Sequence, residues 1–139
     1  MAQFIADEQL DERKVLDPLR RQFSVCRIQE LRPGEQILDD RIPEILLTVR
    51  KPTFLTIDQG FWDRRLCNPG YCILCFALRM DQRQLLSEML RGLLHHPGFR
   101  TRADRMGKVA RVGITTVAFW QFRVRGVQRF ACRATGGRR

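Results

Sequence analysis

One continuous apolar run, from Tyr71 to Leu78, constrains the fold of this chain more than any other feature. A strand with no polar positions has to be buried on both of its faces. Such strands are typical of the centre of a parallel sheet, where helices cover both sides. The run therefore predicts a central or near-central parallel strand.

The remaining segments alternate between strand-like and helix-like patterns. We expect strands over 3–6, 23–28, 53–57 and 71–78, and helices over 10–22, 40–49 and 81–94. Two further β-rich stretches, over 109–116 and 117–124, suggest a hairpin. Asp40 and Asp81 stand at helix starts, where an aspartate side chain can cap the helix. This alternation predicts an α/β protein with a mostly parallel sheet.

The chain has 139 residues, which is enough for one domain with a proper core. We expect this domain over residues 1–130, followed by a basic, frayed tail over 131–139. No apolar stretch reaches the 18 or so residues of a membrane span, and the N-terminus shows no secretory signal. Five cysteines without a disulfide-like spacing favour reduced thiols and a cytoplasmic protein.

Charge is divided unevenly along the chain. Residues 1–66 hold 12 acids and 11 bases, whereas residues 67–139 hold 3 acids and 14 bases. Nearly all of the bases are arginines, whose planar guanidinium suits two-pronged contacts to phosphate. An acidic half joined to a basic half is what an enzyme that cuts phosphodiesters needs, although arginine-rich codon usage is an alternative source of the arginine count.

Three acidic signatures lie where a strand or a loop meets the next element. Asp7 follows the first predicted strand, Asp40 heads the second helix, and Asp58 follows the third strand. In an open parallel sheet, ligands bind outside the carboxyl ends of the strands. Carboxylates gathered there favour a hard divalent cation with oxygen ligands, Mg²⁺ or Mn²⁺. A metal-dependent nuclease is therefore the leading hypothesis.

The same signatures resemble the PIN-domain superfamily, and in particular its small bacterial PIN-like branch, which is akin to toxin–antitoxin toxins. The resemblance rests on the segments Asp7-Glu8-Gln9, Thr56-Ile57-Asp58 and Pro69-Gly70, together with an acid at the head of the second helix, and it spans roughly residues 3–125. It implies a three-layer α/β/α sandwich and a Mg²⁺- or Mn²⁺-dependent ribonuclease. It also implies an RNA substrate, a possible cognate antitoxin and a possible homodimer.

Carried over to this chain, the resemblance makes Asp7, Asp40 and Asp58 the catalytic metal ligands, with Asp39 as a substitute for Asp40. The family turn carries a second aspartate where this chain has Gly60, and Asp63 could return a carboxylate to the site. Each acid also has a purely structural alternative. Asp7 could be a turn residue, Asp40 a plain helix cap, and Asp63 a surface partner of Arg64 or Arg65.

Arginines in the second half are the candidates for contact with RNA phosphates. They are Arg100, Arg102, Arg105, Arg111, Arg123 and Arg125. Aromatic residues are interleaved with them, and unpaired bases can stack on such rings. For the aromatics at 99, 119, 120 and 122 we favour a place in the core, and for the arginines a role on phosphate.

Other interpretations stay open. Cys67, Cys72 and Cys75 suggest a zinc site, but the last two lie three apart on a predicted strand and so point to opposite faces, which favours core packing. A receiver-like domain would use Asp58 as phosphoacceptor and Asp7 with Glu8 for Mg²⁺. A third possibility is a nucleic-acid-binding or interaction module that has lost catalysis.

Overall fold

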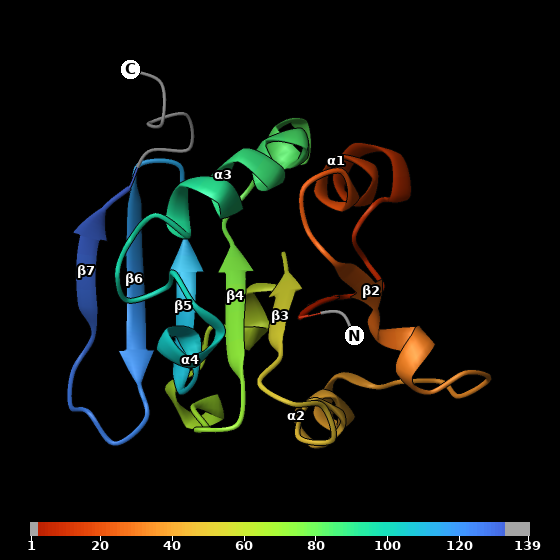
Figure 1. The fold of residues 1–139 in the computed structure, drawn as a ribbon, viewed down its shortest axis with the longest axis horizontal. Coiled ribbons are helices and arrows are strands. Elements are labelled where there is room, and N and C mark those ends of the chain that lie inside the picture. Colours follow the sequence, from red (N-terminus) through yellow and green to blue (C-terminus); the bar gives the residue numbers. More distant parts are fainter. Residues whose placement is uncertain (1–2, 133–139) are drawn as a thin grey trace.

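A seven-stranded, mostly parallel sheet organises the computed structural model, which describes residues 3–132. The strand order is β2-β1-β3-β4-β5-β6-β7, in which β1 to β5 run parallel, β6 runs antiparallel to β5, and β7 runs antiparallel to β6 (Figure 1). The strands are β1 (Phe4–Ala6), β2 (Val25–Arg27), β3 (Thr53–Thr56), β4 (Cys72–Phe76), β5 (Lys108–Val112), β6 (Thr116–Gln121) and β7 (Gln128–Ala131). The predicted α/β class with a mostly parallel sheet is confirmed.

The helices are short, and several begin as 3₁₀ or π turns. They are α1 (Asp17–Arg20), α2 (Ile42–Leu46), α3 (Leu86–Leu93) and α4 (Arg102–Arg105). A π-helical turn over Glu12–Leu16 leads into α1, and a 3₁₀ turn over Asp39–Arg41 leads into α2. Pro18 lies in the first turn of α1, where its missing N–H costs nothing.

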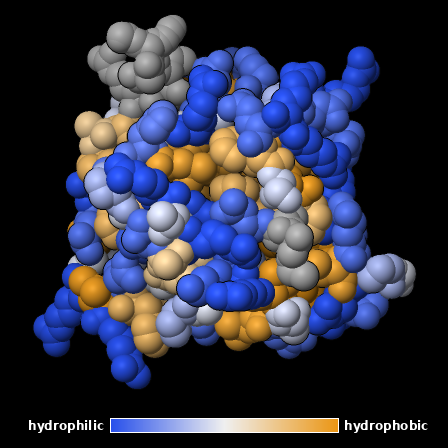
Figure 2. Space-filling model, viewed as in Figure 1, coloured by the Kyte–Doolittle hydropathy of each residue, from blue (hydrophilic) through white to orange (hydrophobic). Residues whose placement is uncertain are grey.

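Apolar residues on the two sides of the sheet form two separate core clusters. On one side Leu55 and Leu74 pack with α1 and α3, and on the other Phe54 and Ile73 pack with α2. All five residues of β4 are buried, as the apolar run predicts. Helices therefore cover both faces of the sheet around β1, β3 and β4, while polar side chains cover much of the outer surface (Figure 2).

Two predicted helix caps are wrong, and two elements of the structure were not predicted. The caps predicted at Asp40 and Asp81 do not form, because both lie inside 3₁₀ turns whose N-cap residues are Leu38 and Arg79. The helix α4 and the strand β7 were not anticipated. Because β7 ends at Ala131, it crosses the predicted boundary at residue 130, and residues 133–139 of the predicted tail lie outside the described part.

Candidate active site

The candidate site lies where the direction of the chain connections reverses. From β1 the chain moves to β2 on one side, whereas β3 lies on the other side of β1. In doubly wound sheets the crevice at such a switch point, outside the carboxyl ends of the strands, is where ligands bind. Asp7 directly follows β1, and Asp58 lies two residues beyond β3. The fold therefore places these two predicted acids at the same crevice.

Asp7 is buried and fixed by its neighbours. Its side chain is only 3% exposed, and its backbone N–H donates to the carbonyl of Leu55 at 2.9 Å. The Thr56 hydroxyl donates to Asp7 Oδ2 at 2.6 Å. Burial raises the pKa of the Asp7 carboxyl, the bond from Thr56 opposes this shift, and the charges of Asp39 and Asp58 add to it.

Thr56 connects the two acids that flank it in space. Its hydroxyl donates to Asp7 and accepts the backbone N–H of Asp58 at 3.0 Å. One hydroxyl group therefore contacts both acids. Because one hydroxyl bonds both residues, a shift in the position of either acid also shifts the hydrogen bond made to the other.

Asp58 is the N-cap of the 3₁₀ turn Gln59–Phe61, and its Oδ1 accepts the N–H of Gly60 at 2.9 Å. A Cβ atom at position 60 would lie 3.1 Å from the same oxygen, which is tighter than an ordinary contact. Glycine at position 60 therefore lets this cap close tightly around Asp58.

The helix-head acid that faces the site is Asp39 rather than Asp40. Burial raises the pKa of the Asp39 carboxyl, and the charge of Asp58, together with a hydrogen bond to it, raises the pKa further. Asp39 also contributes to the raised pKa of Asp7. Asp40, the first choice from the sequence, is exposed like Asp39 and lines the same hollow, but its charge is not among those that raise the pKa of Asp7.

An open hollow of about 390 Å³ lies beside Asp39 and Asp58. It is lined by Asp39, Asp40, Pro43, Asp58, Gly60, Phe61, Asp63 and Leu66. Asp63 is already occupied, because its Oδ2 lies 2.8 Å from Arg65 Nη2 and its Oδ1 accepts from Arg65 Nε at 3.1 Å. Arg65 lowers the pKa of Asp63. Of the two roles weighed for Asp63, the surface pair with Arg65 is the one observed.

Within residues 3–132, no group of three or more His, Cys, Asp or Glu side chains is arranged to hold a metal ion. The donors at the crevice are hard carboxylate oxygens: Asp39 and Asp58 line one hollow, and the charges of both raise the pKa of the buried Asp7. Mg²⁺ is commonly held by one or two carboxylates and keeps several waters. The donor set fits such a partly hydrated ion.

The cysteines have no part in this site. Cys72 and Cys75 are buried in different core clusters on opposite faces of the sheet, as the strand period predicts. Burial raises the pKa of Cys72 to about 12 and also raises that of Cys75. Both thiols are therefore protonated core residues at neutral pH.

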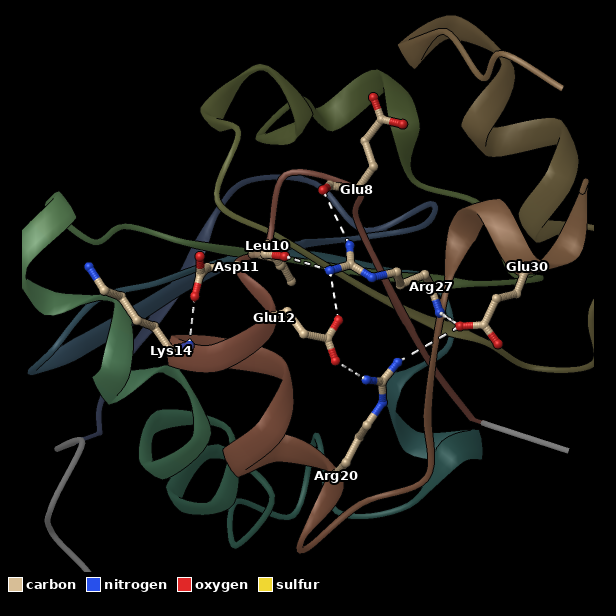
Figure 3. A network of polar contacts seen from close by, with 8 residues as sticks. All are labelled: Glu8, Leu10, Asp11, Glu12, Lys14, Arg20, Arg27 and Glu30. Atoms are coloured by element: carbon tan, nitrogen blue, oxygen red, sulfur yellow. Dashed lines mark hydrogen bonds and ion pairs between the residues drawn. The ribbon is translucent and has the colours of Figure 1, made fainter. Parts of the chain in front are cut away.

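A network around Arg27 holds the loop that follows β1 (Figure 3). The Arg27 guanidinium donates to the carbonyls of Glu8 and Leu10, each at 3.3 Å, and to Glu12 Oε1 at 2.9 Å. Arg20 holds the other oxygen of Glu12 at 2.5 Å. Because Glu8 is the residue after Asp7, this network fixes the backbone of the loop that begins at Asp7.

Arg105 is not available to RNA, which corrects its predicted role. Its side chain is 1% exposed, and it donates to Thr53 Oγ1 and to the Phe99 carbonyl, both at 2.9 Å. It also bonds Gln3 and lies over the Phe4 ring, 5.0 Å from the centroid. Arg105 is a structural residue that ties α4 to β1 and β3.

Most of the other predicted phosphate contacts lie at the edge of the sheet away from the acids. Gln121, at the end of β6, pairs with Lys108 at the start of β5, so Arg123 and Arg125 follow at the edge where the parallel strands begin. Arg100 and Arg102 belong to the connection that returns to this edge, and Arg102 donates to the carbonyl of Lys51 before β3. These four arginines therefore do not surround the candidate acids.

Arg111 is the exception, since it lies toward the carboxyl end of β5. Its Nε donates at 3.2 Å to Gln59 Oε1, and Gln59 is the residue after Asp58. Sequence reasoning overlooked Gln59, which also donates to the carbonyls of Ile57 and Phe76. It also overlooked Arg129, because β7 has no clear strand pattern, and the stacking of Trp62 on Trp120.

No protein-family model, curated protein or solved structure matches this chain. No helix in the described part of the chain is long and apolar enough to span a membrane.

Proposed function

We propose that this protein is a Mg²⁺- or Mn²⁺-dependent ribonuclease of the PIN-like type. The observation that carries the proposal is the set of acids at the β1–β3 crevice: Thr56 bonds Asp7 and the backbone of Asp58, while Asp39 and Asp58 line one hollow. The charges of Asp39 and Asp58 raise the pKa of Asp7, and a cation bound among these carboxylates would relieve their repulsion. The helices on both faces of the sheet support the three-layer α/β/α arrangement that belongs to this proposal.

Asp39 and Asp58 are the residues that would hold the metal, with Asp7 behind them. A divalent cation there would supply a water of lowered pKa and stabilise negative charge on the phosphate. The chain's own residues position the acids. The Thr56 hydroxyl fixes the Asp7 carboxyl and accepts the backbone N–H of Asp58, so it holds the two acids relative to each other.

The partners implied by the resemblance belong to the proposal as well. RNA is the expected substrate, and a cognate antitoxin and a homodimer are the expected protein partners. The wide, open hollow beside Asp39 and Asp58 supports a polymeric substrate more than a small enclosed one.

The substitution Asp58→Asn tests the proposed activity. Asparagine keeps an oxygen that can accept the N–H of Gly60 and so preserves the turn, but it removes the charge. We expect Mg²⁺-dependent cleavage of a single-stranded RNA to fall by at least about a hundredfold, in line with the loss of an electrostatic catalytic group. Cleavage of a fluorescent oligoribonucleotide with Mg²⁺ or Mn²⁺, and with EDTA, measures it.

Asp17→Asn is the matched control, because Asp17 is exposed on α1 and no side-chain bond or ion pair involves it in the described structure. Full activity in Asp58→Asn, or equal losses in the two variants, would contradict the proposal. Binding of RNA that needs no metal and is never followed by cleavage would favour the interaction module instead.

A second candidate is a receiver-like phosphoacceptor, which the strand order favours. The order β2-β1-β3-β4-β5 is the flavodoxin-like order that receivers share. Such a domain needs a hydroxyl residue after the fourth strand and a lysine after the fifth. Here Ala77 and Leu78 follow β4, and Lys108 begins β5. Labelling of Asp58 with acetyl phosphate distinguishes the two functions, and we expect none.

A further inference from the structure

A single row of paired residues crosses the sheet from the acids to its far side. Thr56 in β3 pairs with Cys75 in β4, and Cys75 pairs with Arg111 in β5. Arg111 then pairs with Ala118 in β6, and Ala118 with Arg129 in β7. Residues paired directly across strands point to the same face of a sheet. Arg111 and Arg129 therefore share the face that Thr56 occupies beside Asp7 and Asp58.

Ala118, whose side chain is a single methyl group, lies between the two arginines. Because neighbouring strands are about 4.8 Å apart, the backbones at Arg111 and Arg129 are separated by roughly 10 Å. A hollow of about 220 Å³ lies here, lined by Trp62, Arg111, Thr116, Val117, Ala118 and Arg129. Two long cationic side chains on either side of an alanine can converge on one anion above it.

The charge of these two arginines is not matched by the protein. Both are exposed, and within residues 3–132 neither forms an ion pair with a carboxylate, whereas Arg20, Arg27 and Arg41 all do. Arg111 makes one hydrogen bond, from Nε to the neutral amide of Gln59. Two cations that flank one hollow repel each other until an anion binds between them.

A pair of stacked tryptophans lies beside the arginines. Trp62 comes from the segment after β3 and stacks on Trp120 of β6, with ring centroids 3.8 Å apart and an interplanar angle of 23°. The stack holds Trp62 over this part of the sheet, where it lines the hollow. A rigid indole next to paired arginines is the combination that binds a base together with its phosphate.

We propose that this hollow binds a phosphodiester of single-stranded nucleic acid, with the adjoining base against Trp62. Arg111 and Arg129 hold the phosphate, and Thr116 offers a hydroxyl at its edge. A base inside a duplex is stacked on its neighbours and cannot reach the indole, so an unpaired strand is required. The identification of the strand as substrate rests on the proposed nuclease function.

Position supports the link between this hollow and the acids. Asp58 and Arg111 both act on the pKa of Cys75, Asp58 raising it and Arg111 lowering it, after the larger effect of burial. Gln59 bonds Arg111 on one side and is joined to Asp58 on the other. A strand held at Arg129 and Arg111 thus extends directly toward the carboxylates.

Intrinsic fluorescence reports the occupancy of this hollow, since the chain's two tryptophans are the two that stack here. The test titrates the full chain with an eight-nucleotide oligouridylate in EDTA, so that cleavage plays no part. We expect quenching on binding, and Arg129→Gln should weaken binding about tenfold, as the loss of a charge-assisted bond to phosphate does. Trp62→Phe should weaken binding less and leave only the signal of Trp120.

Arg125→Gln is the matched control, because it removes the same charge from an exposed position at the opposite edge of the sheet. We expect its affinity to stay within about twofold of the parent protein. Arg129 is exposed on an edge strand, so glutamine there should leave the melting temperature unchanged, which a thermal scan checks.

Equal losses in Arg129→Gln and Arg125→Gln would overturn the inference, because binding would then follow net charge alone. Undiminished binding by Arg129→Gln, or equally tight binding of an RNA duplex, would overturn it too. The two proposals fail separately. If binding depends on Arg129 but no metal-dependent cleavage is found, only the nuclease proposal is rejected. If cleavage depends on Asp58 but not on Arg129, only the proposed binding site is rejected.

Discussion

Asp39 and Asp40 differ in what surrounds them, although they are neighbours in the chain. The charge of Asp58 acts on Asp39, and Asp39 acts on Asp7. The sequence could place an acid at this helix head but could not choose between the two. The choice depends on the 3₁₀ turn Asp39–Arg41, which begins one residue earlier than the N-cap predicted at Asp40 and places both residues inside the turn.

The raised pKa of Asp7 predicts how stability depends on pH. When the folded pKa exceeds the unfolded value of 3.8, the folded state binds more protons, so stability decreases as pH rises through this range. Asp7→Asn removes the charge and keeps an oxygen for the Thr56 hydroxyl. In metal-free protein we expect its melting temperature to exceed that of the parent at pH 7, and the difference to vanish below about pH 4.

Thermal unfolding in EDTA between pH 3 and pH 8 measures this difference. Asp17→Asn should show no such gain, since its carboxylate is exposed and has no described side-chain partner. A gain in Asp7→Asn of equal size at pH 3 and pH 7 would show that packing, not charge, is responsible.

Among the elements, those with strong local patterns were predicted and those that depend on neighbours were not. All residues of β4 are buried, and a fully buried strand has a continuous apolar sequence that predicts it directly. Gln128, Arg129 and Ala131 of β7 are exposed, and a solvated edge strand carries no alternation to detect. The helix α4 did have a signal, the capping box from Thr101 to Asp104, which the sequence analysis passed over.

Arg105 shows how an element can depend on one buried cation. It anchors α4 through bonds to the oxygens of Thr53 and Phe99, and burial lowers its pKa. Arg105→Leu would leave these buried oxygens without donors, at a cost of about 1–3 kcal/mol for an unsatisfied group. We therefore expect the free energy of unfolding to decrease by about 2–4 kcal/mol.

Urea denaturation measures this loss, with Arg100→Leu as control. Arg100 is exposed and makes one long bond, 3.3 Å to the carbonyl of His95, so its replacement should cost less than about 1 kcal/mol. Comparable losses in the two variants would mean that the buried contacts of Arg105 add no stability beyond those of a surface arginine.

For the molecule as a whole, the position of the acids could be predicted better than the position of the bases. Parallel strands bring their carboxyl ends to one edge whatever the details, so Asp7 and Asp58 had to meet. The arginines depend on where the chain reverses direction. Because β6 runs antiparallel to β5, Arg123 and Arg125 return to the opposite edge, while Arg129 in β7 comes back toward the acids.

A cation in the crevice should stabilise the whole fold, because binding to the native state alone lowers its free energy by linkage. At a hundredfold excess over the dissociation constant the gain is about 2.7 kcal/mol. For a domain of this size that corresponds to a rise in melting temperature on the order of 5–10 °C. We expect Mn²⁺ to produce this rise in the parent protein and in Asp40→Asn, but not in Asp39→Asn or Asp58→Asn.

The comparison of adjacent variants is the decisive part of this experiment, since Asp39→Asn and Asp40→Asn change net charge equally at neighbouring exposed positions. Protons compete with the metal at Asp39, whose pKa is raised, so the Mn²⁺ effect should also shrink as pH falls. A rise that disappears in Asp40→Asn and persists in Asp39→Asn would restore the ligand first expected from the sequence. If millimolar Mn²⁺ leaves the melting temperature of every form unchanged, the crevice holds no metal and the nuclease proposal falls with it.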